Sequence, residues 1–535
     1  MSRPGQMPTR RASGGPVAHW QRVAAESNWE SAPAASYAPT YTPTYSPAYA
    51  PQQENSAPAG YAANSSGGHP FAEPARSAAL RKQGQAIEAA FARIEPTLLR
   101  LAPRHFDEDF PAVAVQELRS IGIDLPPSLF AAHIMAPLNM RFLEARCVIG
   151  TFCRLVRDGV DRSFNERSEG EDARTLIGRW GFHAIDISPC ADGRLSGLLD
   201  TILRIPPSVI TAREPHAGAL FNITESLRRW ETTELHRWRD GRPNAASEPT
   251  AYLKIGVYHF SSIDPTHEGC AAHGSDTGRA ASSLLERLDQ FAHAVRNIHG
   301  PAAGVATLLI GVDTDTDSIR VHVPDSSGRM ATDRFVDSLK LYGQTVSMPR
   351  EAAKEAVRDA VAACAGVGGG DRATEGMRWF CGYLVKNNMA QVDSVQRDFG
   401  GRYKDAGHTE KLVIVGDAID DLQLRNLAFQ SQAETVEEGA ADLDTGVSIL
   451  RRTHELPGLA VPVLVYFRHD PRIPGSAMRA EFKARRMMSA IIKRYSGLAE
   501  RKKLFVQAGL RATDSADIRV LDPSPDALAK LESYT

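Results

Sequence analysis

From about residue 166 to the end of the chain, short apolar runs alternate with longer amphipathic stretches, and this alternation constrains the fold more than any other feature. Such a pattern is typical of an α/β (or α+β) fold, in which helices connect the strands of a sheet. A charged, glycine-rich stretch from Gly400 to Glu410 interrupts it, so we expect one such domain over 166–410 and another over 411–535. The expected strands are Tyr252–Phe260, Ala306–Val312, Ser318–Val323, Leu412–Val415 and Val463–Phe467, and the expected helices are Ser282–Asn297, Arg350–Cys364, Met377–Asp398 and Ala477–Gly497.

Residues 1–73 differ in composition from everything that follows. Pro, Ser, Ala and Gly dominate and Val, Ile and Leu are nearly absent, so the segment buries too little apolar surface to offset its ordering entropy. We therefore expect a disordered tail, with a polyproline-like spacer where Tyr and Pro repeat between Tyr37 and Pro51. Trp20, Trp29 and nearby arginines are residue types that anchor interfaces, which makes the tail either a partner contact or a plain linker.

Between residues 74 and 165 apolar residues recur at helical spacing, and prolines break the segment into short pieces. We expect a small helical domain without catalytic residues. The apolar positions are Leu80, Ile87, Phe91, Ile94, Leu98 and Leu101, followed by Phe142, Ile149, Phe152 and Val156.

Composition excludes several classes of protein. Lysine plus arginine (62) nearly balance aspartate plus glutamate (64), so no basic field for nucleic acid is expected. No apolar run approaches the ~18 residues of a membrane helix, and the N-terminus has no apolar core like that of a signal peptide. Six cysteines in 535 residues are too few for a disulfide framework. We expect a cytoplasmic protein whose thiols are free, buried or bound to metal.

Two cysteines and a histidine form a candidate metal site. Cys190 follows a Pro189 turn, His259 ends an expected strand, and Cys270 lies eleven residues later in a loop. Two thiolates and an imidazole are ligands that zinc prefers, and three protein ligands leave one position open for water, as in catalytic sites. The residues alone leave two alternatives open: core cysteines beside an ordinary strand histidine, or His267 as the histidine ligand.

Two charged residues follow Cys190 at once. Asp192 would orient the reacting water, and Arg194 would keep Asp192 ionised and away from the metal through a bidentate ion pair. A zinc deaminase would need a glutamate in an H-x-E pattern near the cysteines, and this sequence has none there. A purely structural zinc site in a shell or scaffold protein is the remaining alternative.

The string Cys190-x-Asp192-x-Arg194 resembles the first half of the β-class carbonic anhydrase signature. The wider chain resembles the carboxysome shell carbonic anhydrases, a divergent β-like group once called epsilon, over residues 183–208, 252–276 and 308–325. The resemblance implies a zinc enzyme that interconverts CO2 and bicarbonate, with Cys190, His259 and Cys270 as ligands and Asp192 and Arg194 as a catalytic dyad. His267 and Cys270 also spell the H-x-x-C of ordinary β-class enzymes, but the spacing of the carboxysomal relatives favours His259.

The resemblance has further implications. It places the enzyme in a bacterial carboxysome, where it supplies CO2 to Rubisco, with the tail contacting Rubisco or shell proteins. It implies at least a homodimer, and it makes 411–535 a degenerate copy of the catalytic half. No cysteine follows Cys381, so the copy has no thiolate ligand and we expect one zinc ion per chain.

One acidic motif stays outside this site. Asp313, Asp315 and Asp317 alternate like the start of a calcium-binding loop, but the glycine and distant glutamate of an EF-hand are missing. We expect a solvated hairpin between two strands.

Overall fold

The computed structural model describes residues 68–125, 140–159, 177–178, 180–245, 247–300, 303–366, 372–404, 407–454 and 458–521. All of them belong to one compact unit, Thr42–Thr535. The expected tail contacts, Trp20 and Trp29, lie outside the described residues. None of the described helices is long and apolar enough to cross a membrane.

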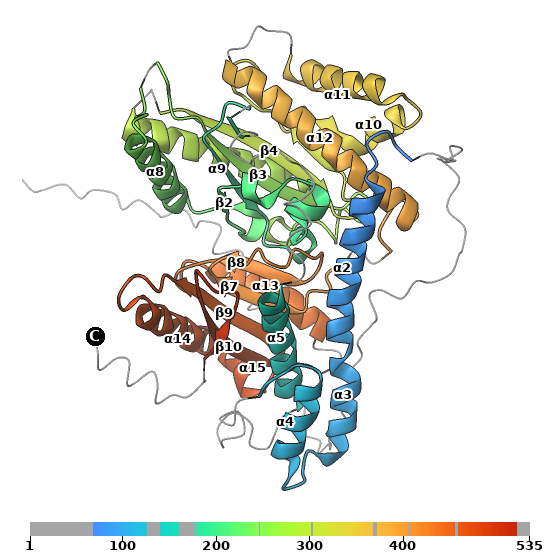
Figure 1. The fold of residues 1–535 in the computed structure, drawn as a ribbon, viewed down its shortest axis with the longest axis vertical. Helices are drawn as coiled ribbons and strands as arrows, with labels where there is room; N and C mark the ends of the chain where they lie inside the picture. The colour runs from blue at the N-terminus through green and yellow to red at the C-terminus, as the bar shows by residue number, and fades with distance from the viewer. Residues whose placement is uncertain are drawn as a thin grey trace, which may run out of the picture. The chain divides into compact units, whose positions relative to one another are not determined.

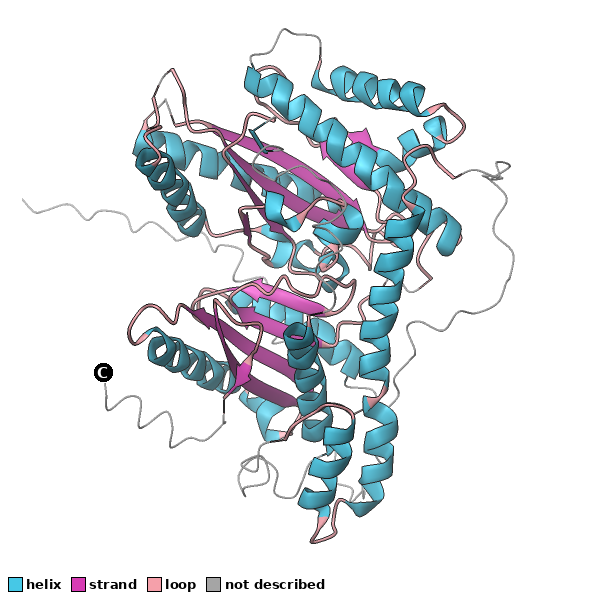
Figure 2. Ribbon diagram, in the orientation of Figure 1, coloured by secondary structure: helices cyan, strands magenta, loops and turns pink. Residues whose placement is uncertain are grey.

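The described chain begins with helices, which confirms the expected helical N-terminal region (Figures 1 and 2). Pro74 occupies the first turn of α2, where proline needs no amide donor. Ile87 and Phe91 of α2 are buried, as are Ile94 and Leu98 of α3, so the spacing seen in the sequence marks the packed faces. The helices are α2 (Pro74–Ala92), α3 (Ile94–Leu101), α4 (Phe110–Ser120) and α5 (Met140–Asp158).

The first sheet has six strands in the order β2-β1-β3-β4-β5-β6. β2, β1, β3 and β4 run parallel, whereas β5 and β6 are antiparallel to their neighbours. Helices α8 (Ile223–Arg239) and α9 (Thr277–His299) connect the parallel strands, and α9 packs on β3 and β4 (Figure 1). Helices α10 (Ser338–Thr345), α11 (Arg350–Ala365) and α12 (Arg372–Asp398) follow and pack near β5 and β6. The strands are β1 (Ala184–Pro189), β2 (Ala212–Arg213), β3 (Tyr252–Phe260), β4 (Val305–Asp313), β5 (Ile319–His322) and β6 (Val336–Asp337).

The second sheet has five strands in the order β11-β10-β9-β7-β8, and only β11 is antiparallel. Successive residues of a strand face opposite sides. Val506 and Ala508 of β10 pack with α13 and α14, while the ring of Phe505, the residue before Val506, faces the other side and contacts Phe142 of α5. The N-terminal helix α5 therefore covers the second sheet on the side away from its own connecting helices. The elements are β7 (Leu412–Gly416), β8 (Ala428–Gln432), α13 (Ala440–His454), β9 (Val461–His469), α14 (Ser476–Arg494), α15 (Ser496–Glu500), β10 (Leu504–Ala512) and β11 (Arg519–Val520).

The two mixed sheets confirm the expected α/β architecture at this coarse level. All five strands and four helices expected from the sequence are present, with ends shifted by a few residues. Three longer strands were not expected, namely β1, β8 and β10. The turn between β4 and β5 corrects a prediction: Asp313, Asp315 and Asp317 are all buried, so it is not a solvated hairpin.

The residues just before α2 are fixed against the helices that follow the first sheet. The backbone amide of His69 donates to Asp393 of α12 at 3.0 Å, and its ring lies 2.9 Å from the Thr345 hydroxyl and stacks on Tyr342. The amide of Phe71 donates to Nδ1 of His69, which requires that nitrogen to carry no proton. Burial accordingly lowers the pKa of His69 to about 4, although the charge of Asp393 works in the opposite direction.

We predict that the stabilisation from His69 is lost as the pH falls from 6.5 toward about 4. In the unfolded chain His69 is protonated below the higher pKa, and in the folded protein only below the lower one. Acid therefore favours the unfolded chain and lowers the free energy of unfolding by about 2 kcal/mol near pH ~5. The thermal midpoints of wild type and His69→Gln should differ clearly near neutral pH and converge in acid. The same comparison with exposed His236→Gln is the control, and a gap for His69→Gln that does not change with pH would contradict the prediction.

Candidate metal centre

The sheet brings Cys190 and His259 to the same edge. Strands β1 and β3 are parallel neighbours with Pro189 opposite Val257, so the residues that follow these two positions emerge side by side. Cys190 comes directly after β1, and His259 is the second-last residue of β3. Cys270 reaches the same place from the loop after β3, just before the turn that leads into α9. The carboxyl edge of parallel strands is where α/β folds usually build their sites.

The three side chains form a compact, buried cluster. Their potential ligand atoms all lie within 4.8 Å of one another, and the exposed fractions are 4% for Cys190, 1% for His259 and 2% for Cys270. The two sulfurs are 3.9 Å apart and both thiols are free. Two sulfurs on a tetrahedral zinc ion, each at ~2.3 Å, lie about 3.8 Å apart. Both the donor set and the sulfur separation therefore fit zinc; that these residues bind it stays a prediction.

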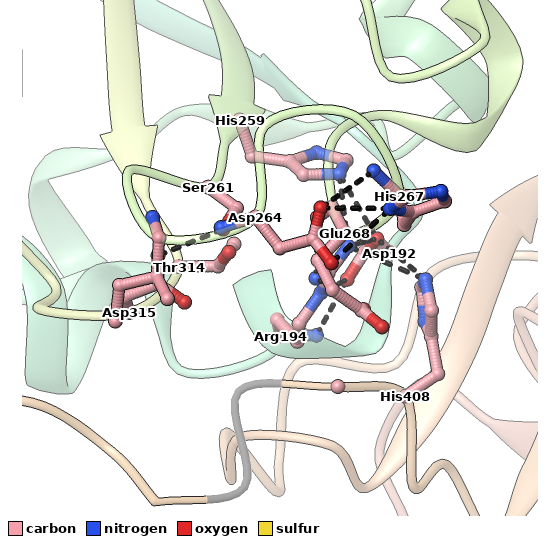
Figure 3. Close-up of polar contacts among 12 residues, drawn as sticks. Asp192, Arg194, His259, Ser261, Asp264, His267, Glu268, Thr314, Asp315 and His408 are labelled. Atoms are coloured by element: carbon pink, nitrogen blue, oxygen red, sulfur yellow. Dashed lines mark hydrogen bonds and ion pairs between the residues drawn. The ribbon is translucent and has the colours of Figure 1, made fainter.

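Asp192 and Arg194 make a buried ion pair beside His259 of the cluster (Figure 3). The guanidinium is bidentate: Nε donates to Oδ1 of Asp192 at 2.9 Å and Nη2 donates to Oδ2 at 2.8 Å. The backbone amide of Arg194 also donates to Oδ1. Oδ2 lies 3.0 Å from Nε2 of His259, so the carboxylate sits between the arginine and the imidazole. The pair is thus fixed at the edge of the candidate metal site.

Burial and charge set the proton affinities of the cluster. Burial raises the pKa of Cys190 well above that of an ordinary thiol. Burial also disfavours the ionised form of Asp192, but the charges of Arg194 and His259 outweigh it and hold the pKa of Asp192 well below the usual range. For His259 burial opposes protonation, yet Asp192 and Cys190 raise its pKa to about 9. A buried thiol ionises readily only beside a positive charge, and a metal ion at the sulfurs would supply it.

His267 lies outside this cluster. Its side chain is 80% exposed and its Nδ1 is 2.9 Å from the carboxylate of Asp264. The neighbouring residue, Glu268, takes part in the site through its backbone, because its carbonyl accepts a hydrogen bond from Nη1 of Arg194 at 2.7 Å. The geometry therefore favours His259 over His267 as the third ligand.

His408 and Glu410 join the site without having been expected from the sequence. Nε2 of His408 lies 3.3 Å from Nη2 of Arg194 and 3.8 Å from Oδ2 of Asp192, and its Nδ1 lies 2.9 Å from Glu410. Glu410 in turn accepts a hydrogen bond from the amide of Gly193 at 3.1 Å, where any side chain would collide with it. His408 and Arg194 are 214 residues apart in the sequence, and no motif or spacing links them.

Three further histidines of this half of the chain contact other groups. His183 precedes β1, at the end of that strand opposite to Cys190, and its ring contacts Arg237. The ring of His299 stacks on Trp230. His273 follows Cys270 closely, with Nε2 3.5 Å from the carbonyl of Gly218.

Three family models cover almost the whole described chain. The catalytic-domain model of the Carboxysome Shell Carbonic Anhydrase matches residues 172–408, its C-terminal model matches 409–522, and its N-terminal model matches 69–160.

Curated relatives agree with these matches. The carboxysome shell carbonic anhydrase of Halothiobacillus neapolitanus is 40% identical over 459 residues, which cover 83% of this chain and 88% of that protein. The protein of the same name from Hydrogenovibrio crunogenus is 37% identical over 77% of this chain and 79% of its own. That of Prochlorococcus marinus strain MIT 9313 is 38% identical over 84% and 87%.

We predict that His259→Ala loses bound zinc and that His267→Ala keeps it. The imidazole of His259 lies in the buried cluster, whereas that of His267 is directed to Asp264 at the surface. Zinc per chain is measured in both purified variants and in wild type by elemental analysis. Full zinc occupancy in His259→Ala would refute the ligand assignment, and loss of zinc from His267→Ala alone would transfer it to His267.

Proposed function

The chain belongs to the carboxysome shell carbonic anhydrase family and is a carbonic anhydrase, and we propose that it interconverts CO2 and bicarbonate at one zinc ion held by Cys190, His259 and Cys270. The observation that carries this proposal is the buried cluster of two thiols and an imidazole with its sulfurs 3.9 Å apart. Bound there, zinc supplies the Lewis acidity that makes water nucleophilic near neutral pH.

The proposed work of the chain's own residues is orientation. Arg194 holds Asp192 by two side-chain hydrogen bonds and keeps it ionised at the edge of the cluster. Oδ2 of Asp192, which accepts only one of the Arg194 hydrogen bonds, would accept a further one from the attacking water and so aim its oxygen at CO2. Because Asp192 is bound to Arg194, it does not turn toward the sulfurs and take the open ligand position. We propose Asp192 and Arg194 as the catalytic dyad.

A purely structural zinc site in a shell or scaffold protein is the alternative. Such a site has four protein ligands. Among the described residues the cluster offers three, and the nearby carboxylate of Asp192 is already paired with Arg194. The three-ligand arrangement favours catalysis.

The decisive experiment measures zinc content and CO2 hydration in wild type, Cys190→Ala and Asp192→Ala. We expect Cys190→Ala to lose both zinc and activity. Asp192→Ala should keep its zinc and lose about 10- to 100-fold in kcat, the usual effect of removing a group that orients metal-site chemistry. Asp107→Ala is the control, because this exposed carboxylate pairs with Arg104 in the helical region. Zinc without hydration activity in wild type, and no dependence on Asp192, would favour the structural alternative.

We also propose that the second sheet is a degenerate copy of the first. In chain order both parallel sets run second-first-third-fourth, as β2-β1-β3-β4 and β8-β7-β9-β10, and in both an antiparallel strand follows beside the fourth. Gly416 pairs with Tyr466 as Pro189 pairs with Val257. By this register Asp417 and Arg468 occupy the positions of Cys190 and His259. No cysteine follows Cys381, which supports one zinc ion per chain.

The proposed organisation is a tail over 1–73, in which His69 and Phe71 are already buried against the folded chain, a helical domain over 74–165, a catalytic domain over 166–410 and a C-terminal domain over 411–535. We propose that the enzyme is located in the carboxysome, acts there as at least a homodimer, and supplies CO2 to Rubisco. The tail, with Trp20, Trp29 and nearby arginines, would contact Rubisco or shell proteins.

We predict that deleting residues 1–67 abolishes binding to Rubisco or to shell proteins and leaves hydration activity intact. The deletion must stop before Gly68, because His69 and Phe71 are buried against the catalytic half. Binding is measured with purified partners, and kcat/KM serves as the control for an undamaged active site. A truncated protein that still binds and is still encapsulated would contradict the assignment of the tail.

A further inference from the structure

The turn between β4 and β5 buries three carboxylates close to the metal centre. The exposed fractions of Asp313, Asp315 and Asp317 are 2%, 1% and 2%. A buried carboxylate is costly unless hydrogen-bond donors surround it. The hydrogen-bond donors around Asp313 and Asp315 therefore identify the segment of the chain that these carboxylates hold in place.

Most of these donors come from one short loop. Oδ2 of Asp315 accepts hydrogen bonds from the Ser261 hydroxyl at 2.8 Å and from the amide of Ile263 at 2.9 Å. Asp313 accepts from the hydroxyl of Ser262 at 2.7 Å and from its amide at 3.2 Å. The amide of Thr314 between them donates to the carbonyl of Phe260 at 2.8 Å. The turn therefore fastens the chain at the point where β3 ends (Figure 3).

That loop connects His259 to Cys270 and passes the ion pair on its way. The Ser261 hydroxyl also accepts a hydrogen bond from the amide of Asp264, and Oδ1 of Asp264 accepts one from the amide of His267. The next residue is Glu268, whose carbonyl holds Nη1 of Arg194 at 2.7 Å. A continuous series of hydrogen bonds thus runs from Asp315 through Ser261 and Asp264 to His267, the residue before Glu268.

We propose that Asp315, assisted by Asp313, is a positioning residue for the metal centre. It fixes the start of the His259–Cys270 loop, and so sets where Cys270 approaches the other two ligands and where the Glu268 carbonyl holds Arg194. This proposal rests on the proposed zinc site. It assigns to the acidic turn a role in the same reaction without contact with substrate or metal.

The contacts of Asp315 indicate that the loop is held by a hydrogen-bond acceptor at this position and not by the negative charge of the side chain. Its donors converge on Oδ2, and Oδ1 has no hydrogen-bond partner among the described atoms. An asparagine can place its carbonyl oxygen where Oδ2 lies and its amide where Oδ1 lies. Asp315→Asn should therefore preserve the loop, whereas Asp315→Ala removes the acceptor altogether.

The test compares wild type, Asp315→Ala, Asp315→Asn and Ser261→Ala in the full-length protein. Zinc release to a chromophoric chelator and the absorption spectrum of the cobalt(II)-substituted protein are measured beside kcat, KM and the thermal midpoint. We expect Asp315→Ala to release zinc about tenfold faster, with an altered cobalt spectrum and a lower kcat. Asp315→Asn keeps the acceptor and should release zinc clearly more slowly than Asp315→Ala, and Ser261→Ala should lie between Asp315→Ala and wild type. Asp325→Ala is the matched control, because this carboxylate orders the turn after β5 by accepting hydrogen bonds from Ser327.

Wild-type zinc release and an unchanged cobalt spectrum in Asp315→Ala would overturn the proposal, as would equal losses in Asp315→Asn and Asp315→Ala. If Asp315→Ala does not fold, Ser261→Ala decides, and zinc release at the wild-type rate there would overturn it. Failure of the proposed function is seen separately, because it would show as missing zinc or missing hydration activity in wild type itself.

Discussion

The parallel register of β1 against β3 is the constraint on which the rest of the site depends. It places the residue after Pro189 beside the end of β3, so Cys190 and His259 meet without any loop having to bring them together. Backbone hydrogen bonds of a sheet interior hold this register, and a slip by one residue would turn every side chain to the other face. Only Cys270 arrives on a loop, so it is the proposed ligand whose position needs additional support.

Several segments that are distant in the sequence hold the ion pair beside the candidate ligands. Glu268 holds Arg194 from one side, and His408 with Glu410 approaches from the other. Each partner is a carbonyl, a carboxylate or an imidazole placed against the same guanidinium or the loop beside it. Arg194 has five donors in a rigid plane, so several fixed acceptors determine its orientation fully. The ion pair with Asp192 is therefore held by the fold as a whole.

The sequence predicted best what depends on local pattern. Tyr252–Phe260 matches β3 residue for residue, because its nine buried positions are rich in aromatic and β-branched residues although Lys254 and His259 interrupt the apolar run. β1 was missed because its buried run contains Asp186, whose charge is satisfied by Lys254 from the neighbouring strand at 2.7 Å. The acidic turn looked solvent-exposed for the same reason: its donors come from residues about 50 positions away. His408 was missed because only the tertiary fold brings it to Arg194 and Asp192.

Among the described residues, only the first sheet has a cluster of two thiols and an imidazole at the ends of its strands, and the residues at the corresponding positions of the second sheet explain why. Both present two residues at the ends of adjacent parallel strands, and both must satisfy the polar groups there. In the first sheet they are a thiol and an imidazole, two groups that can coordinate the same zinc ion. In the second they are Asp417 and Arg468, and the amide of Arg468 donates to the Asp417 carboxylate at 2.7 Å. The second pair carries opposite charges of its own, so it needs no metal ion to balance it. The same backbone register thus supports a metal ligand set in one half and a self-neutralised pair in the other.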